Sequence, residues 1–219
     1  MHELLHAVYI DGNVRMYQIS NNSSPVFLSL YGTFDMNDQK IVHDLNEIIK
    51  SQRAFFQDYE FPYYAISLIE EKDLGSMGGT RLHNSFLAYL PQNMEQSNYY
   101  ILFAHEHLHN WIGGKIRNNT QEELNYWWTE GFTDYYSRVI ALRSGEILID
   151  DFILECNEFL KNYYLSPVIN EPNIRIAQDF WKDYDVEKLP YYRGFVFAIY
   201  LNDLIKKHDA TKNQSRKTF

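Results

Sequence analysis

A chain of 219 residues, 45% hydrophobic and 16% aromatic, is long enough to bury a core as one or two domains. Its 29 acidic residues outnumber its 20 basic ones, and a net charge of −9 repels phosphate backbones, so we expect no nucleic-acid partner. Cys156 is the single cysteine, which excludes an intrachain disulfide and a thiolate metal cluster. No secretory signal and no membrane-spanning apolar run is visible, so the cytoplasm is the default expectation.

The first half of the chain is predicted to form strands around one helix. Residues 4–31 alternate short apolar runs with the turn-like segments DGN and NNSSP, a pattern typical of strands joined by tight turns. From Asp35 to about Tyr59 apolar residues recur at helical spacing, with Asp35 or Asn37 as the N-cap. AISLIEE and SFLAYLP are predicted strands on either side of the glycine-rich segment GSMGGT.

The second half is predicted to be helical. Gly113 and Gly114 are expected to end the first of its helices. The predicted helices cover residues 96–112, 122–143, 147–164 and 191–207. Strands followed by helices predict an α+β fold in two lobes, about 1–92 and 93–219, with a ligand cleft between them.

The segment AHEHLHNW contains an HExxH pattern inside a predicted helix. The i, i+4 spacing places His105 and His109 on one helix face, where both imidazoles can converge on one ion. Glu106 lies about 100° around the helix, within reach of a metal-activated water. His107 points away from this face and is interpreted as a packing or surface residue. The alternative is that a histidine-rich helix produced the pattern by chance.

A third ligand is predicted in WWTEGFTDYYS on the next helix. Glu130 follows His109 after 20 intervening residues, and two imidazoles with one carboxylate make the ligand set of a catalytic zinc site. Asp134, one turn further on, is a candidate to accept a hydrogen bond from a ligand histidine. The alternative is a solvated helix face, although Tyr126 and Trp127 nearby argue against full exposure.

With these motifs the chain resembles the gluzincin peptidases of the aminopeptidase N and glycyl aminopeptidase types. HEHLHNWIGG resembles HExxHxWxG, and WWTEGFTDYY resembles WxxEGFxxYY. LPYYRGFVFAIYLNDL is similar to a PYxKG helix start, which implies that Tyr191 stabilises the tetrahedral intermediate, with Tyr192 as a rival and core packing as the alternative for both. The resemblance covers roughly residues 75–204. It implies a thermolysin-like domain over residues 1–219, one Zn²⁺ per chain, and peptide or protein substrates.

Two departures from the resembled pattern stand out. The interval from His109 to Glu130 is two residues longer than is usual in the aminopeptidase N type, which a loop insertion around NNTQ accommodates. Gly78 and Gly79 stand where GxMEN carries the glutamate that binds the substrate amine, and Arg81 would repel an ammonium group. The segment from Gly78 to Arg81 is still predicted to bind an extended substrate through its backbone.

The predicted function is zinc-dependent hydrolysis of peptide bonds with Glu106 as general base, and not typical aminopeptidase activity. The main alternative is a peptidase-like binding module that is catalytically weak or inactive. Zinc-dependent hydrolysis of an epoxide or ester is less favoured, and a purely helical interaction protein is favoured least. The polar end of the chain, KKHDATKNQSRKTF, comes soon after the Tyr191 helix, which leaves open that the chain is a fragment of a longer protein.

Overall fold

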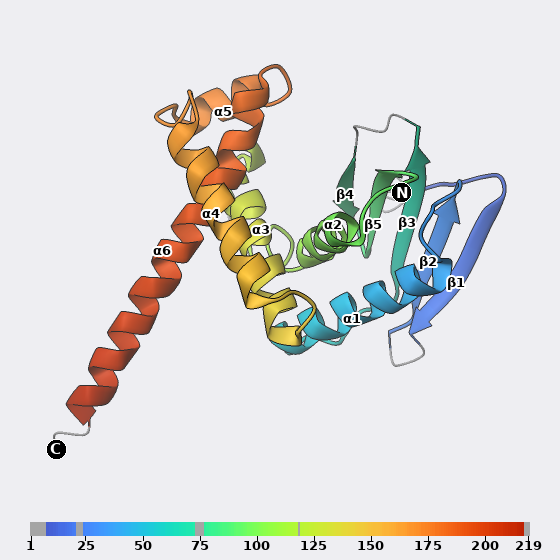
Figure 1. Cartoon of the computed structure of the whole chain (residues 1–219), viewed down its shortest axis with the longest axis horizontal. Coiled ribbons are helices and arrows are strands. Elements are labelled where there is room, and N and C mark those ends of the chain that lie inside the picture. The colour runs from blue at the N-terminus through green and yellow to red at the C-terminus, as the bar shows by residue number, and fades with distance from the viewer. Residues whose placement is uncertain (1–7, 21–23, 73–76, 118, 217–219) are drawn as a thin grey trace. The chain divides into compact units, whose positions relative to one another are not determined.

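The computed structural model describes two compact units of the chain (Figure 1). The first comprises residues 1–115 with 143–146, and the second comprises residues 116–142 with 147–219. The described residues are 8–20, 24–72, 77–117 and 119–216. The predicted strand start at residues 4–7, most of the predicted NNSSP turn, and the start of the glycine-rich segment lie outside them. The prediction of a single catalytic domain with two lobes stays a prediction.

A five-stranded mixed sheet forms the centre of the first unit. Its order is β1-β2-β3-β5-β4, in which the three central strands are parallel and each edge strand runs antiparallel to its neighbour. The strands are β1 Val14–Ser20, β2 Val26–Tyr31, β3 Tyr64–Glu71, β4 Gly78–Leu82 and β5 Ser85–Pro91. Strand β4 overlaps the segment predicted only as glycine-rich and extends beyond it to Leu82. Its two glycines have low β-propensity, so the sequence pattern did not indicate a strand. The predicted strand SFLAYLP is confirmed as β5.

Two helices pack with this sheet in the first unit. Helix α1 (Asp38–Phe56) begins after Asn37, whose side chain accepts a hydrogen bond from the Gln39 amide, so Asn37 is the N-cap. Helix α2 (Gln96–Leu108) ends four residues before the predicted end at 112, and Gly113 follows with φ of +84°. The side chains that alternate inward along the central strands are fully buried and form the core with residues of both helices: Val26, Leu28, Leu30, Ile66, Leu68, Phe86, Ile41, Leu45 and Phe103.

The second unit is helical. Its elements are the 3₁₀ helix η2 Glu122–Asn125, α3 Tyr126–Ser144, α4 Ile149–Leu165, α5 Asn173–Asp179 and α6 Tyr184–Arg216. The predicted start of the last helix at 191 was wrong. Helix α6 begins seven residues earlier, at Tyr184, and the Asp183 carboxylate accepts hydrogen bonds from the amides of Asp185 and Val186 in its first turn. Pro190 lies inside this helix. Helix α5 was not predicted, because seven residues are too few to show a helical period.

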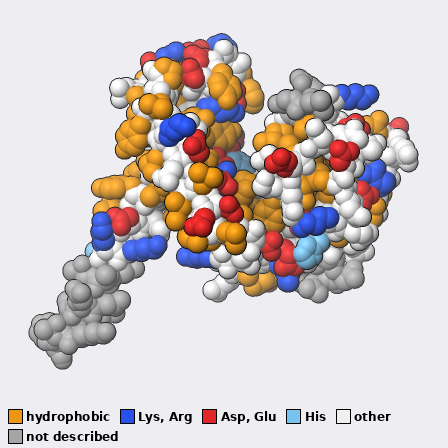
Figure 2. Space-filling model, viewed as in Figure 1, with side chains coloured by type: hydrophobic (Ala, Val, Ile, Leu, Met, Phe, Trp, Pro, Cys, Tyr) orange, Lys and Arg blue, Asp and Glu red, His pale blue; other side chains and the backbone are white. Residues whose placement is uncertain are grey.

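Many large apolar side chains of the second unit are exposed (Figure 2). Helix α4 has no buried residue, and its exposed apolar side chains are Ile149, Ile153, Leu154, Tyr164 and Leu165. No helix in the described part of the chain combines the length and hydropathy needed to cross a membrane. The mixed sheet of the first unit and the helices of the second confirm the predicted α+β class.

Candidate metal centre

His105 and His109 occupy the end of α2, and their side chains meet. The two Nε2 atoms are 2.9 Å apart, and the rings lie at 83° to each other. His105 is 8% exposed, so its imidazole is largely shielded from solvent. The i, i+4 spacing therefore produces the convergence of two nitrogens that the sequence predicts.

The tautomer of His109 follows from its second nitrogen. Nδ1 lies 3.2 Å from the backbone carbonyl oxygen of Ile112, and because a carbonyl can only accept, Nδ1 carries the hydrogen. In the neutral ring, Nε2 then carries the lone pair that faces His105. Two nitrogen ligands of a tetrahedral zinc ion, each at about 2.0 to 2.1 Å, would lie about 3.3 Å apart, so the pair needs little adjustment to bind one. The donor chemistry of these residues fits zinc.

Glu106, predicted as the general base, lies between these histidines in sequence and is 5% exposed. Its side chain lies against strand β4, because a Cβ atom built on Gly79 would come within 2.5 Å of the Glu106 Cγ, Cδ and Oε1 atoms. The sequence identified both residues separately. It carried no signal of their contact, since that contact depends on β4 lying beside α2.

His107 occupies the opposite side of α2 and is fully buried. Its Nδ1 atom is 2.7 Å from the Gln52 side-chain oxygen, and Gln52 in turn donates to the backbone oxygen of Ala104 at 2.7 Å. Burial, with a smaller contribution from the Arg53 charge, lowers the pKa of His107 to about 3, so this imidazole is neutral. The packing interpretation of His107 is therefore confirmed.

Two further polar side chains support the end of α2, and sequence reasoning missed both. Gln52 lies on α1 and is buried. The one sequence signal that could have identified it is a polar residue within the apolar stripe of that helix. Asn110 donates through Nδ2 to the Tyr64 hydroxyl at 3.0 Å and to the backbone oxygen of His107 at 2.6 Å. These hydrogen bonds connect α2 to α1 and to the sheet, which restricts rotation of the helix that carries both histidines.

Glu130 and Asp134 lie one turn apart on α3 in the second unit. Glu130 is half-buried, and its charge is one of the carboxylates that, after burial, raise the pKa of Tyr126 to about 12. Asp134 accepts a hydrogen bond from Arg138 Nη1 at 3.0 Å, and both side chains of this ion pair are at most 14% exposed. Asp134 therefore does not belong to a fully solvated face. Its hydrogen bond to a ligand histidine stays a prediction.

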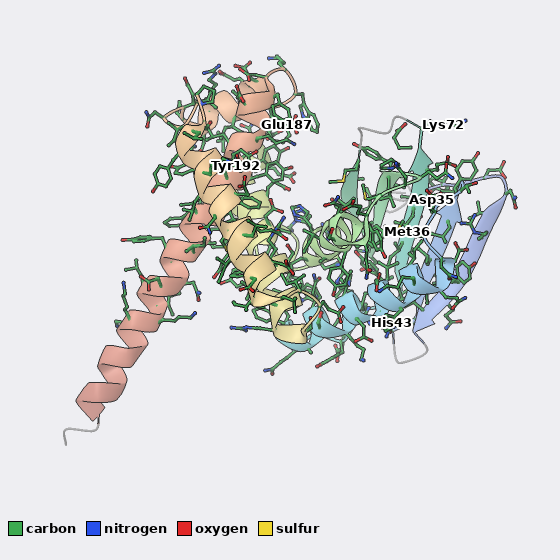
Figure 3. The ribbon with its side chains drawn as sticks, viewed as in Figure 1. Asp35, Met36, His43, Lys72, Glu187 and Tyr192 are labelled. Atoms are coloured by element: carbon green, nitrogen blue, oxygen red, sulfur yellow. The ribbon has the colours of Figure 1, made fainter. Side chains whose placement is uncertain are left out.

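Tyr191 and Tyr192 are neighbours on α6, the helix on which Figure 3 labels Tyr192. Tyr191 packs against an apolar cluster of the second unit, and the Lys188 ammonium lies 5.6 Å from the centre of its ring. Tyr192 makes an edge contact with the Phe159 ring at 5.9 Å, and burial raises the pKa of its hydroxyl. Both tyrosines therefore have apolar neighbours, and the assignment of Tyr191 to the reaction stays a prediction.

Helices α3 and α6 approach each other through two glycines. A Cβ atom built on Gly194 would lie 2.8 Å from both the Gly131 Cα atom and the Trp127 carbonyl carbon. The two backbones are thus in direct contact. Gly131 follows Glu130, and Gly194 lies three residues after Tyr191, so this contact sets the position of these two helices within the second unit.

Strand β4 carries the remaining predicted site residues. Gly79 and Arg81 pair with Ala88 and Phe86, whose side chains are buried on the helix-covered face of the sheet, so this register places both residues on the same face. Gly78 belongs to the other face. Arg81 is exposed, and none of the described residues forms an ion pair with its side chain.

Acidic residues also lie just before this strand. Glu70 accepts a hydrogen bond at 2.8 Å from the backbone amide of Thr33, in the loop after β2. Asp73 lies outside the described residues.

The comparisons with known proteins agree with the motifs. Residues 98–189 match the model of the M61 glycyl aminopeptidase family. This segment contains His105, Glu106, His109 and Glu130 and ends two residues before Tyr191. No curated protein sequence gives a significant match to the chain.

Solved structures of similar fold are longer than this chain. An aminopeptidase N family protein from Idiomarina loihiensis is 18% identical, with a TM-score of 0.70, over 86% of this chain and 37% of that one. An M1 zinc metallopeptidase from Deinococcus radiodurans is 15% identical, with a TM-score of 0.51, over 84% of this chain and 39% of that one. A mutant of the Deinococcus radiodurans enzyme with bound Tyr-Ser-Ala substrate gives the same identity and coverage and a TM-score of 0.50. The chain thus spans less than two fifths of the length of these proteins, and its fold is similar to part of theirs.

Proposed function

We propose that this chain hydrolyses peptide bonds with one zinc ion bound by His105, His109 and Glu130. The observation that carries the proposal is the pair of Nε2 atoms 2.9 Å apart, with the buried Glu106 carboxylate next to them in sequence. Support also comes from the match of residues 98–189 to a peptidase family. The contribution of Glu130 rests on its motif and on the two-histidine, one-carboxylate ligand set of catalytic zinc sites.

A zinc ion in this position supplies a Lewis acid for a carbonyl oxygen and lowers the pKa of water to about 7. Glu106 accepts the proton of the attacking water and delivers it to the leaving nitrogen. The Tyr191 hydroxyl donates a hydrogen bond to the oxyanion that forms, which stabilises the transition state more than the bound substrate. Asp134 orients a ligand histidine by accepting its second ring hydrogen.

The substrate peptide binds as an extended chain along β4. This strand is at the edge of the sheet, with β5 as its one partner strand among the described residues, so its other edge can pair with a peptide backbone. Gly78, Gly79 and Arg81 provide no carboxylate for a substrate ammonium, and Arg81 repels one. The proposed activity is therefore cleavage within a chain, or of peptides with blocked or acidic ends, and not general aminopeptidase activity.

The role of Glu106 is tested by Glu106→Gln, because the amide cannot accept the water proton. With zinc content unchanged, hydrolysis of an internally quenched peptide should fall by a factor on the order of 100 to 10,000. The matched control is Glu95→Gln at the start of the same helix, where the side chain makes no capping hydrogen bond and hydrolysis should be unchanged. Wild-type turnover in Glu106→Gln would contradict the proposed mechanism.

The role of Tyr191 is tested in the same assay with Tyr191→Phe. Because the phenol acts in the transition state, kcat should fall strongly while KM changes little. Tyr192→Phe on the same helix is the control and should leave kcat close to wild type. The reverse result would transfer the role to Tyr192.

Substrate class is tested with single amino-acid arylamides and with internally quenched peptides, free or acetylated at the N-terminus, at equal zinc occupancy. We expect slow cleavage of the arylamides and similar cleavage of free and acetylated peptides. Fast cleavage of arylamides with acetylated peptides left intact would reveal an amine anchor elsewhere. If the zinc-loaded chain binds peptides without cleaving any of them, the result favours the alternative of a peptidase-like binding module. The absence of an amine-binding glutamate at Gly78 and Gly79 is the sequence feature behind that alternative.

A further inference from the structure

We infer that Gly79 is a positioning residue for Glu106: the absence of a side chain at this point of β4 is what allows the general base to lie against the strand. The inference rests on the proposed function for its catalytic consequence. The contact itself lies within the first unit and does not depend on zinc.

The contact leaves no space for even one additional carbon atom. A Cβ on Gly79 would lie 2.5 Å from the Cγ, Cδ and Oε1 atoms of Glu106, whereas carbon atoms in favourable contact are about 3.5 to 4.0 Å apart. The Glu106 carboxylate would have to move by about 1 Å. Cγ is one of the three atoms, so rotation of the terminal carboxylate alone cannot relieve the overlap, and a side chain that is 5% exposed has few other positions.

Backbone conformation does not explain the glycine. Among the described glycines, those with positive φ are Gly12, Gly32, Gly113 and Gly145. Gly79 is not one of them, and it pairs with Ala88 in a regular antiparallel ladder that any residue can adopt. A glycine inside a strand costs stability and often marks a close approach to that position. Here the group that approaches is the Glu106 side chain.

Gly78 provides an internal comparison on the same strand. A Cβ on Gly78 would meet the Tyr89 ring, with its hydroxyl oxygen at 2.5 Å and its Cζ at 2.7 Å. Tyr89 is 38% exposed, so its ring can move into solvent. Gly78→Ala is therefore the same chemical change at the neighbouring position, on the face that does not contact Glu106.

A role limited to packing of β4 against α2 makes a different prediction from a positioning role. Loss of packing would lower the stability of the unit and leave kcat of the folded, zinc-loaded protein unchanged. Displacement of the general base would lower kcat and leave KM and zinc content close to wild type, because a misplacement of about 1 Å can cost about 100-fold in rate.

The kinetic test compares Gly79→Ala with Glu95→Gln in the full chain at equal zinc occupancy. Gly79→Ala should lower kcat about 100-fold with KM within about 3-fold of wild type, and Glu95→Gln, whose side chain makes no capping hydrogen bond at the start of α2, should keep both within about 3-fold. Shortening the base with Glu106→Asp should cost less kcat in the Gly79→Ala background than in the wild type, because the shorter side chain leaves room for the new methyl group. Wild-type kcat in Gly79→Ala would overturn the inference.

Two readouts are independent of hydrolysis. A crystal structure of Gly79→Ala should show the Glu106 carboxylate displaced by about 1 Å, which Gly78→Ala should not show. If Gly79→Ala folds poorly, Glu106→Ala should restore the melting temperature that Gly79→Ala removes, since the clash involves that side chain. An unmoved carboxylate, or no recovery of the melting temperature, overturns the inference even if the wild-type chain proves inactive and the proposed function fails.

Discussion

Helices α2 and α3 carry the proposed metal ligands, and their surroundings hold them in different ways. Around α2, buried polar groups form directional hydrogen bonds, such as those from Asn110 to the Tyr64 hydroxyl and from Gln52 to the backbone of α2. Helix α3 is held against α6 by two glycines whose backbones touch. Hydrogen bonds restrict the rotation of α2 about its axis. For α3, the close contact of Gly131 with Gly194 sets its distance from α6. The two helices should therefore respond to different substitutions.

The largest expected effect on stability is that of Gly194→Ala. A Cβ at this position meets backbone atoms of Trp127 and Gly131, and backbone of a packed helix cannot rotate away as a side chain can. We expect a loss of about 3 kcal/mol in the free energy of unfolding, at the upper end for overpacking, measured by urea denaturation. Lys206→Ala, exposed on the same helix, should change it by less than about 0.5 kcal/mol. A loss below about 1 kcal/mol for Gly194→Ala would mean that the two helices can separate without cost.

An intermediate effect is expected for Asp134→Asn on zinc affinity. If Asp134 orients a ligand histidine, competition with a chelator should show affinity reduced by a factor of about 10 to 100. Asp134 also pairs with Arg138, which pairs with Glu155 as well. Glu155→Gln therefore weakens the same ion-pair network without touching the proposed metal centre, and it should leave zinc affinity unchanged. Equal losses in both variants would assign Asp134 to the ion pair alone.

The smallest effect is a pH dependence contributed by His107. Its folded pKa of about 3 lies below the unfolded value of about 6.5, so the unfolded chain binds the proton more tightly. The stability contribution is complete above the unfolded pKa and is lost as pH falls below it towards 3. Between pH 7.5 and 5.5 wild type should lose about 1 kcal/mol more than a variant with Gln52→Leu and His107→Leu, both measured without zinc by urea denaturation. Parallel pH profiles would show that His107 is not buried as a neutral group.

Local patterns predicted the elements whose signal lies within a few residues. The apolar alternation of β5 and the helical spacing of α1 were sufficient, and the i, i+4 spacing of His105 and His109 predicted their convergence. Strand β4 and helix α5 were missed, because one is rich in glycine and the other is only seven residues long. The start of α6 was predicted at residue 191, just after Pro190, whereas the helix begins at Tyr184 and contains Pro190.

Contacts between distant segments could not be predicted from the sequence. Gln52 and His107 are 55 residues apart, and their contact requires α1 and α2 to pack side by side. The contact of Gly79 with Glu106 similarly requires β4 to form the sheet edge next to α2. In both cases the residue type was visible in the sequence, but its partner was determined by tertiary packing.

The central claim is that one zinc ion binds to His105, His109 and Glu130, and zinc binding measures it directly. After equilibrium dialysis against zinc, elemental analysis should find one zinc per wild-type chain, and Glu130→Gln and His105→Ala should weaken binding severely. Glu122→Gln, an exposed acid in the same unit as Glu130, should bind zinc as wild type does. A wild-type chain that retains no zinc, or a Glu130→Gln variant with wild-type affinity, would contradict the account.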